Sequence, residues 1–430
     1  MIAILFIGLL VLIFIGVPVI LALGLIGLAG IVIVPELVVA LYPQKMFSTL
    51  DSFSLLALPY FILAGELMAR GGISRRLVTF AETVVGHMRA GLAQSNIVAS
   101  MVFSGVSGSS TADTSAIGSV LIPAMKEKGY KPGYAAAITA VSGTIGAIIP
   151  PSMTMIVYGA LANVSIGGLF LGGIVPGILV GFALMGVVYF QSLNAVRYPE
   201  MQRRTGRFVL AAVLKELPKV WGALLAPLII VGGILGGVFT ATEAGVVACI
   251  YSFVISYFVY RTIGLKDLPG ILLSAALTTS MVSGIIGIAG GLGWLLAYLN
   301  FNQLILGTIL AVTDQPLVVF FLLVATMLVL TMFVDSMAVL IIAVPIAVYI
   351  GATFHIDPFQ LGVALVMATQ IGATTPPVAV LLFVASSIAR CRYGETVRYA
   401  WPFIGAEIFV LALVMLIVPI ASAIPHWAFR

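Results

Sequence analysis

The sequence predicts an all-α polytopic membrane protein built from two inverted-topology repeats. Of its 430 residues, 62% are hydrophobic and only 8% are charged, which excludes a soluble globular protein. Two apolar stretches, at 143–152 and 371–378, are interrupted by glycine followed by Pro-Pro. The two stretches belong to an internal repeat. Each repeat is expected to contain one re-entrant helical hairpin and one discontinuous transmembrane helix.

The two interrupted stretches mark the candidate binding region. Proline lacks a backbone N–H and clashes with the preceding turn, and glycine adds backbone freedom, so neither stretch can continue a regular helix. Inside lipid, backbone groups freed in this way are tolerated only where they face protein or a water-filled cavity. A broken membrane helix is therefore a candidate binding site.

Apolar length defines the elements of the first repeat, residues 1–195. A full span needs ~20 apolar residues, so two shorter apolar pieces around a Ser- and Gly-rich break predict a re-entrant hairpin. A stretch that mixes charged and apolar residues predicts an amphipathic arm at the membrane surface. In order, we expect spans at 1–34 and 55–68, an arm at 70–89, the hairpin at about 91–125, the broken helix at about 132–163 and a span at about 169–193.

A basic connector at 196–220 is expected to lie in the cytoplasm and to separate the repeats. The remaining chain, 221–430, is expected to contain one extra helix and the second repeat. Its expected elements are spans at 221–238, 243–260 and 268–298, an arm at 300–315, the hairpin at about 316–349, the broken helix at about 358–390 and a last span at 403–420.

The repeat follows from the positions of prolines and glycines. Five residues of the first repeat recur 226 residues later: Pro132, Gly146, Pro150, Pro151 and Pro176 correspond to Pro358, Gly372, Pro376, Pro377 and Pro402. The hairpins register at 222 residues instead: Asp113, Ala116 and Pro123 correspond to Asp335, Ala338 and Pro345. We therefore expect a four-residue insertion between hairpin and broken helix.

Basic residues predict that the repeats are inverted. Lys126, Lys128 and Lys131 follow the first hairpin, whereas the equivalent loop at 351–357 has no Lys or Arg. The bias is reversed after the broken helices, because the loop after the second is basic and the loop after the first is not. Cytoplasmic loops are enriched in Lys and Arg, so equivalent loops are expected on opposite sides of the membrane. The N-terminus is expected in the cytoplasm.

The chemistry of the breaks suits a secondary transporter with its site near the middle of the membrane. Unwound carbonyls and hydroxyls are oxygen ligands suited to Na⁺, and the N-termini of half-helices offer N–H groups to an anion. For any single hydroxyl, a bond to its own helix backbone is an equally good interpretation. The candidates are Ser104, Ser107, Ser109, Ser110, Thr111, Thr144, Thr374 and Thr375.

Two carboxylates, Asp113 and Asp335, are expected at the hairpin tips. Ionisable residues within the membrane are functional by default, but each could instead cap the helix that follows it. Both interpretations stay open for both residues. Glu243 is expected to cap a helix, and the scattered histidines indicate no metal site.

Four motifs in order along the chain resemble those of the large membrane subunit of TRAP (tripartite ATP-independent periplasmic) transporters. The resemblance covers essentially the whole chain and implies Na⁺-coupled import of organic anions, such as C4-dicarboxylates, sialic acid or other sugar acids, by an elevator-type mechanism. It also implies a bacterial inner-membrane location, a separate small four-helix membrane subunit and a periplasmic solute-binding protein. The motifs are FSGVSGSSTADTSAIGS (103–119), GTIGAIIPPS (143–152), GGVFTATEAG (236–245) and IGATTPPV (371–378).

The resemblance also implies two or more sites for Na⁺, and a substrate site. The first Na⁺ site would involve Ser104, Ser107, Gly146 and Ile149. The second Na⁺ site would involve Thr331, Gly372, Thr375 and Val378. Substrate contacts are expected from Ser109, Ser110, Thr111, Asp113, Thr144, Asp335 and Thr374.

Three other functions fit the sequence less well. A channel would need a continuous polar path, whereas polarity here is confined to the breaks. An intramembrane enzyme would need a catalytic arrangement, and the spans contain no HExxH motif and no Ser/His arrangement. The nearest alternative is a stand-alone dicarboxylate carrier, coupled to Na⁺ or H⁺, that works without a binding protein.

Overall fold

The computed structural model describes every residue except 1, 35–36, 197, 203–208 and 430. All the regular elements in the described residues are helices. Seven of the helical stretches are long and apolar enough to cross a membrane. The predicted class, an all-α polytopic membrane protein, is confirmed.

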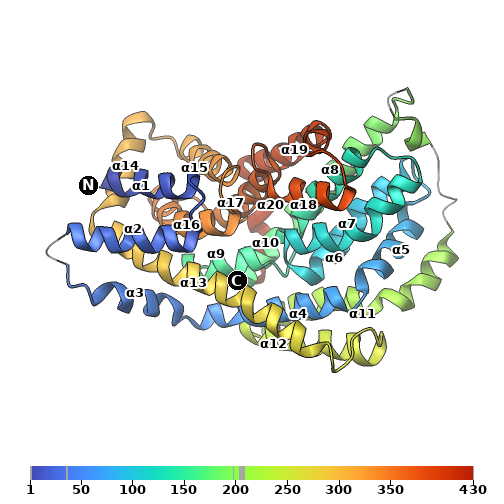
Figure 1. Cartoon of the computed structure of the whole chain (residues 1–430), viewed down its shortest axis with the longest axis horizontal. Helices are drawn as coiled ribbons and strands as arrows, with labels where there is room; N and C mark the ends of the chain where they lie inside the picture. Colours follow the sequence, from blue (N-terminus) through green and yellow to red (C-terminus); the bar gives the residue numbers. More distant parts are fainter. Residues whose placement is uncertain (1, 35–36, 197, 203–208, 430) are drawn as a thin grey trace.

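The described residues of the first half of the chain form ten α-helices (Figure 1). They are α1 (Ile2–Phe14), α2 (Val19–Ile33), α3 (Leu41–Leu50), α4 (Ala57–Arg70), α5 (Ile73–Val85), α6 (Gly91–Ser107), α7 (Ser110–Glu127), α8 (Pro132–Gly143), α9 (Met153–Ala162) and α10 (Ile166–Ser192). Short 3-10 turns precede α4 (Phe53–Leu56) and follow α8 (Thr144–Ala147).

The connector contains a 3-10 turn at Pro199–Gln202. Ten more α-helices are described after this turn. They are α11 (Leu210–Leu235), α12 (Ala241–Val254), α13 (Leu268–Tyr298), α14 (Phe301–Val312), α15 (Pro316–Thr331), α16 (Ser336–Thr353), α17 (Pro358–Thr374), α18 (Val380–Ala389), α19 (Tyr393–Leu416) and α20 (Pro419–Ala428). A π-helical turn, Ile255–Val259, extends α12.

Several helix bounds differ from the sequence-based expectation. The expected first span is two helices, because Gly16 has a φ of 91° and Pro18 cannot donate a backbone hydrogen bond. Helix α11 begins within the expected connector, and α19 begins ten residues before residue 403. Hydrophobicity marks the part of a helix that suits lipid, whereas the helix itself continues into polar residues.

The hairpins register with each other at 226 residues. Ser110–Glu127 and Ser336–Thr353 have the same length and lie 226 residues apart, as do the starts of α8 and α17. The expected 222-residue register and four-residue insertion are therefore wrong for these helices. Asp335 corresponds structurally to Ser109, the N-cap of α7, and not to Asp113.

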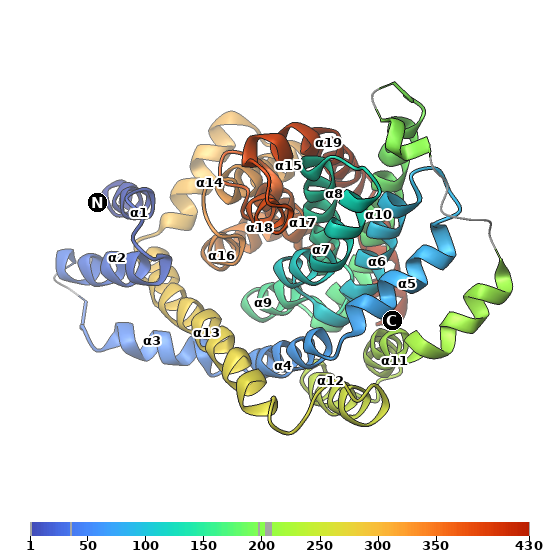
Figure 2. The same cartoon turned by 45° about the vertical axis from the view of Figure 1, so that its right-hand side comes forward.

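The helices form an inner body and an outer frame (Figure 2). The inner body contains both hairpins, α6–α7 and α15–α16, with the interrupted helices α8–α9 and α17–α18 and the long helices α10 and α19. The outer frame contains α1–α4 and α11–α13, in which α12 packs on α4, and α13 packs on both α2 and α3. The arms α5 and α14 lie between frame and body.

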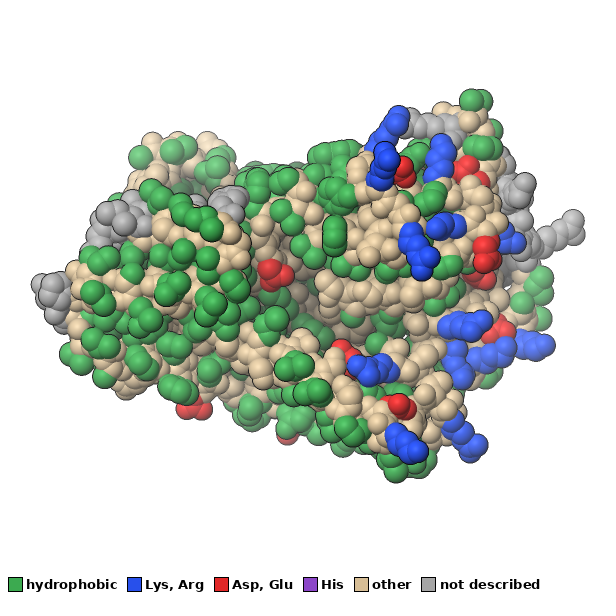
Figure 3. Space-filling view, in the orientation of Figure 1, with side chains coloured by type: hydrophobic (Ala, Val, Ile, Leu, Met, Phe, Trp, Pro, Cys, Tyr) green, Lys and Arg blue, Asp and Glu red, His purple; other side chains and the backbone are tan. Residues whose placement is uncertain are grey.

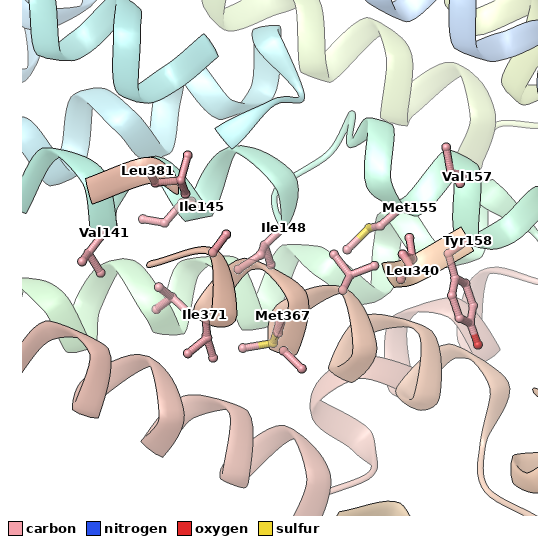
Figure 4. Packing of buried hydrophobic residues seen from close by; sticks show 14 of the residues in the cluster. Val141, Ile145, Ile148, Met155, Val157, Tyr158, Leu340, Met367, Ile371 and Leu381 are labelled. Carbon is pink, nitrogen blue, oxygen red and sulfur yellow. The ribbon is translucent and has the colours of Figure 1, made fainter. Parts of the chain in front are cut away.

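The inner body has a packed apolar core where the interrupted helices meet (Figure 4). Val141 and Ile145, on the first interrupted helix, lie near Ile371 and Leu381 of the second, and all four side chains are buried. Because this core joins the two halves of the chain, displacement of one interrupted helix would carry the other with it.

Charge is unevenly distributed over the surface (Figure 3). On this face, Lys and Arg side chains gather over the end of the molecule that carries α5, α8 and α11. The other end, with α1, α2 and α14, is largely hydrophobic in the same view.

Candidate functional site

The hairpin tips are shaped by helix capping. Gly108, with a φ of 65°, is the C-cap of α6, and Ser109 caps α7 by accepting a hydrogen bond from the N–H of Ala112 at 3.4 Å. On the second hairpin, Oδ1 of Asp335 accepts from the N–H groups of Met337 and Ala338 at 3.0 and 3.2 Å. Each tip therefore points the N-terminus of a helix toward the space in front of it.

Both tips line one small cavity of about 120 Å³. Four residues expected to contact substrate meet there: Ser109, Ser110, Thr111 and Asp335. The other three, Asp113, Thr144 and Thr374, do not line the cavity. The structure thus brings the two hairpins together at one polar site and places the remaining candidates behind it.

Four helices begin at this cavity. Its walls include the first residues of α7 and α16, Met153 and Thr154 at the start of α9, and Val380 and Leu381 at the start of α18. The N-terminus of a helix carries a partial positive charge and unpaired N–H groups, so four of them around one space favour an anion. The carboxylate of Asp335 opposes this at α16.

Sequence reasoning missed Gln370, which also lines the cavity. Its Oε1 accepts a hydrogen bond from the buried Ser110 hydroxyl at 2.6 Å, so the tip of the first hairpin is tied to α17. The 226-residue register relates Gln370 to Thr144, a candidate site residue, and this relation could have identified Gln370 as a candidate.

Asp113 lies behind the first tip and is fully buried. Its two carboxylate oxygens are hydrogen-bonded by the hydroxyls of Ser107 and Ser104, the latter at 3.1 Å. Because Ser109 caps α7, the capping interpretation is wrong for Asp113. It is right for Asp335, which in addition faces the cavity.

The first expected Na⁺ group is compact around Asp113. Ser104 and Ser107 contact the carboxylate, and a Cβ atom at Gly146 would contact the same carboxylate. The absence of a side chain at Gly146 therefore lets the Asp113 carboxylate approach the interrupted backbone closely. Ile149 follows the 3-10 turn, and its N–H bonds the carbonyl of Ile145 at 2.9 Å.

The second expected Na⁺ group is also brought together. A Cβ atom at Gly372 would contact the hydroxyl of Thr331, and the N–H of Val378 bonds the carbonyl of Met332 at 3.3 Å. The hydroxyls of Thr331 and Thr375 bond their own helices, to Met327 at 2.8 Å and Ile371 at 2.7 Å. For these two hydroxyls the backbone interpretation is correct in this conformation, which leaves their lone pairs available to an ion.

A second residue missed from the sequence, Glu407 of α19, lies on the other side of the breaks. It is only 1% exposed and contacts the hydroxyl of Thr144, and the side chain of Thr374 also interacts with its carboxyl group. The residues around Glu407 in the sequence are as apolar as those of any other span. The only signal that could have identified Glu407 is that carboxylates are rare within membrane spans.

Comparisons with known proteins agree with this architecture. Residues 6–420 match the family model of the tripartite ATP-independent periplasmic transporter, DctM component. The chain is 38% identical to the C4-dicarboxylate TRAP transporter large permease protein DctM of Pseudomonas aeruginosa, over 89% of this chain and 88% of that protein. It is 36% identical to the sialic acid TRAP transporter large permease protein SiaM of Vibrio cholerae, over 86% of each chain.

A solved structure shares the fold at low sequence identity. The YdaH transporter of Alcanivorax borkumensis, described as having an unusual topology, superimposes with a TM-score of 0.57 and 14% identity, over 87% of this chain and 88% of that chain. The relatives named above are transporter permeases, and no enzyme family is indicated. On its match to the family model and its relatives, the chain belongs to the tripartite ATP-independent periplasmic transporters, as their large permease component.

Proposed function

We propose that this chain imports an organic anion across the inner membrane, driven by a Na⁺ gradient and supplied by a periplasmic binding protein. The observation that carries the proposal is the cavity between the tips, where four helix N-termini and the hydroxyls of Ser109, Ser110 and Thr111 converge. These groups suit a carboxylate. The C4-dicarboxylate and sialic acid relatives favour a small organic acid as substrate.

Na⁺ would bind at the two compact groups behind the tips. Asp113 with Ser104 and Ser107 offers a carboxylate and hydroxyl oxygens at the first, in close contact with the backbone at Gly146. At the second, Thr331 and Thr375 offer hydroxyl lone pairs beside Gly372, and the interrupted backbone adds carbonyls. Hard oxygen ligands of this kind suit Na⁺.

Movement of the inner body against the outer frame would carry the site across the membrane. In support, each interrupted helix packs mainly within the inner body. An apolar cavity of about 590 Å³ separates the arm α14 from the second hairpin, so this hairpin is not tightly packed against it. The proposal therefore predicts an elevator-type mechanism.

Two further proteins complete the proposed assembly: a small four-helix membrane subunit, which would enlarge the frame, and the binding protein. We place the end of the molecule rich in Lys and Arg in the cytoplasm, following the positive-inside rule. The cytoplasmic position of the N-terminus stays a prediction. That prediction assumed a single first span, whereas the structure has two helices there, α1 and α2.

A transport assay tests the function directly. The purified chain and its small subunit are reconstituted in proteoliposomes, and uptake of candidate organic acids is measured with and without an inward Na⁺ gradient and with and without the binding protein. We expect uptake only when both are present. Gradient-driven uptake by the chain alone would instead establish the alternative, a stand-alone dicarboxylate carrier, and no uptake under any condition would refute import.

A further inference from the structure

Glu407 is a buried carboxyl group that the proposed Na⁺ and substrate sites do not use. It projects from α19 between the two interrupted helices, where it contacts Thr144 at the first break and interacts with Thr374 at the end of α17. It therefore links two segments that are far apart in the sequence. An ionised carboxylate in such surroundings is costly unless cations or several donors stabilise it.

Too few protons are available around Glu407 for an ionised carboxylate. The Thr144 hydroxyl has one proton and two acceptors, Oε1 of Glu407 and the carbonyl of Val141 at 2.7 Å. The Thr374 hydroxyl donates to the carbonyl of Ile371 at 2.8 Å. Oε2 of Glu407 is buried and has no hydrogen-bond partner. One proton on the carboxyl would let it donate to Thr144, whose own proton could then serve Val141.

In the part of the chain that the structure describes, no positive charge lies near enough to replace that proton. Helices α8, α10, α15, α17 and α18, which pack against α19, contain no Lys, Arg, His, Asp or Glu. Their titratable groups are the tyrosines Tyr134 and Tyr189. His426 of α20 is engaged by Asp357 at 2.6 Å.

The remaining charged groups are also separated from Glu407. On α19 itself, Arg398 precedes Glu407 by nine residues, or about 13 Å of helix, and Glu395 lies one turn further away. Across the first break lies Asp113, whose charge would repel a second carboxylate.

We propose that Glu407 is a proton-binding site that holds the two interrupted helices together, and that its proton makes transport sensitive to pH. The proton comes from hydronium in water: one O–H bond forms on the carboxyl, and a water molecule is released. When the proton is lost, an unpaired negative charge is left between Thr144 and Thr374. The inner body then loses one of the polar contacts that join its halves. The transport part of this inference rests on the function proposed above.

The proton itself can be detected without transport. Infrared spectra of the purified chain at neutral pH are compared with those of Glu407→Gln and of a control, Glu243→Gln. Glu243 is an exposed capping residue, and Gln can keep the capping box. We expect the wild type and the control to show the C=O band of a protonated carboxylic acid that Glu407→Gln lacks. If the band is unchanged in Glu407→Gln, Glu407 is ionised and the proposal is wrong.

The functional part is tested by uptake over a range of pH at a constant Na⁺ gradient. For one required proton, wild-type uptake should fall about tenfold per pH unit at the alkaline end. Glu407→Gln, which resembles the protonated acid, should transport without this alkaline loss, and Glu243→Gln should behave as wild type. The same alkaline loss in Glu407→Gln would refute the role in transport. If wild type shows no uptake at any pH, the proposed function fails. The infrared result still decides whether Glu407 is protonated.

Discussion

The hydrogen bond between Ser110 and Gln370 shows how single residues define this site. It is 2.6 Å long, buried, and joins residues 260 positions apart. The sequence identified Ser110 because hydroxyls near a Gly-rich break are visible in a motif. It did not identify Gln370, because a glutamine within an apolar helix gains its role from a partner that only tertiary packing supplies.

Ser110→Ala should lower the free energy of unfolding by about 1–3 kcal/mol, because it leaves the buried Gln370 oxygen without a donor. It should also weaken substrate uptake through a higher KM. Ser119→Ala is the matched control, since the Ser119 hydroxyl on the same helix is exposed and bonds only Ala116. Reversible denaturation and uptake kinetics measure both effects, and equal behaviour of the two variants would argue against the bridge.

Gly372→Ala should raise the Na⁺ concentration needed for half-maximal uptake by about tenfold. The added Cβ would overlap the hydroxyl of Thr331 and lie 2.7 Å from the carbonyl of Leu328, so it would displace the Thr331 side chain from its proposed position as an ion ligand, and overpacking of this kind costs about 1–3 kcal/mol. Gly186→Ala is the control, because no atom lies within 4 Å of a Cβ there. An unchanged Na⁺ dependence in Gly372→Ala would remove the second ion site from this position.

At the scale of the elements, the breaks and their order could be predicted, but the alignment of the hairpins could not. Pro-Pro after glycine ends a helix wherever it occurs, so the two interrupted helices were evident from local chemistry. The alignment of Asp113 with Asp335 was wrong, because the two residues have different structural roles. Asp113 is buried against Ser104 and Ser107, whereas Asp335 caps α16. Equal residue types at a plausible spacing do not reveal which residue begins a helix.

Asp335→Asn should keep α16 intact, because asparagine also caps helices, yet it should reduce Na⁺-driven uptake about tenfold if the charge at the cavity contributes. Asp335→Ala should in addition destabilise the chain by about 1 kcal/mol through loss of the cap. Asp357→Asn is the control: Asp357 caps α17 but does not line the cavity. Uptake by Asp335→Asn at the wild-type rate, with normal expression, would make Asp335 a cap alone.

At the scale of the whole molecule, the sequence did not reveal which helices pack together to form the inner body and which form the outer frame. Hydrophobicity predicts which segments enter the membrane, but it does not say that α13 packs against α2, α3 and α4. These contacts depend on pairs of apolar surfaces that all look alike in sequence. The internal repeat carried more information, because it related two distant segments to one site.

Movement of the inner body as a unit is the central claim, and a pair of distance measurements tests it most directly. With Cys249 and Cys391 replaced by serine, spin labels are placed on exposed positions by Ser119→Cys with Thr278→Cys, from body to frame, or Ser119→Cys with Thr353→Cys, within the body. Distances are measured in transport-active protein without Na⁺ and with Na⁺ and substrate.

We expect the distance between body and frame to change between these conditions and the distance within the body to stay constant. A constant distance between body and frame in protein that transports, or a change confined to the pair within the body, would contradict an elevator-type movement.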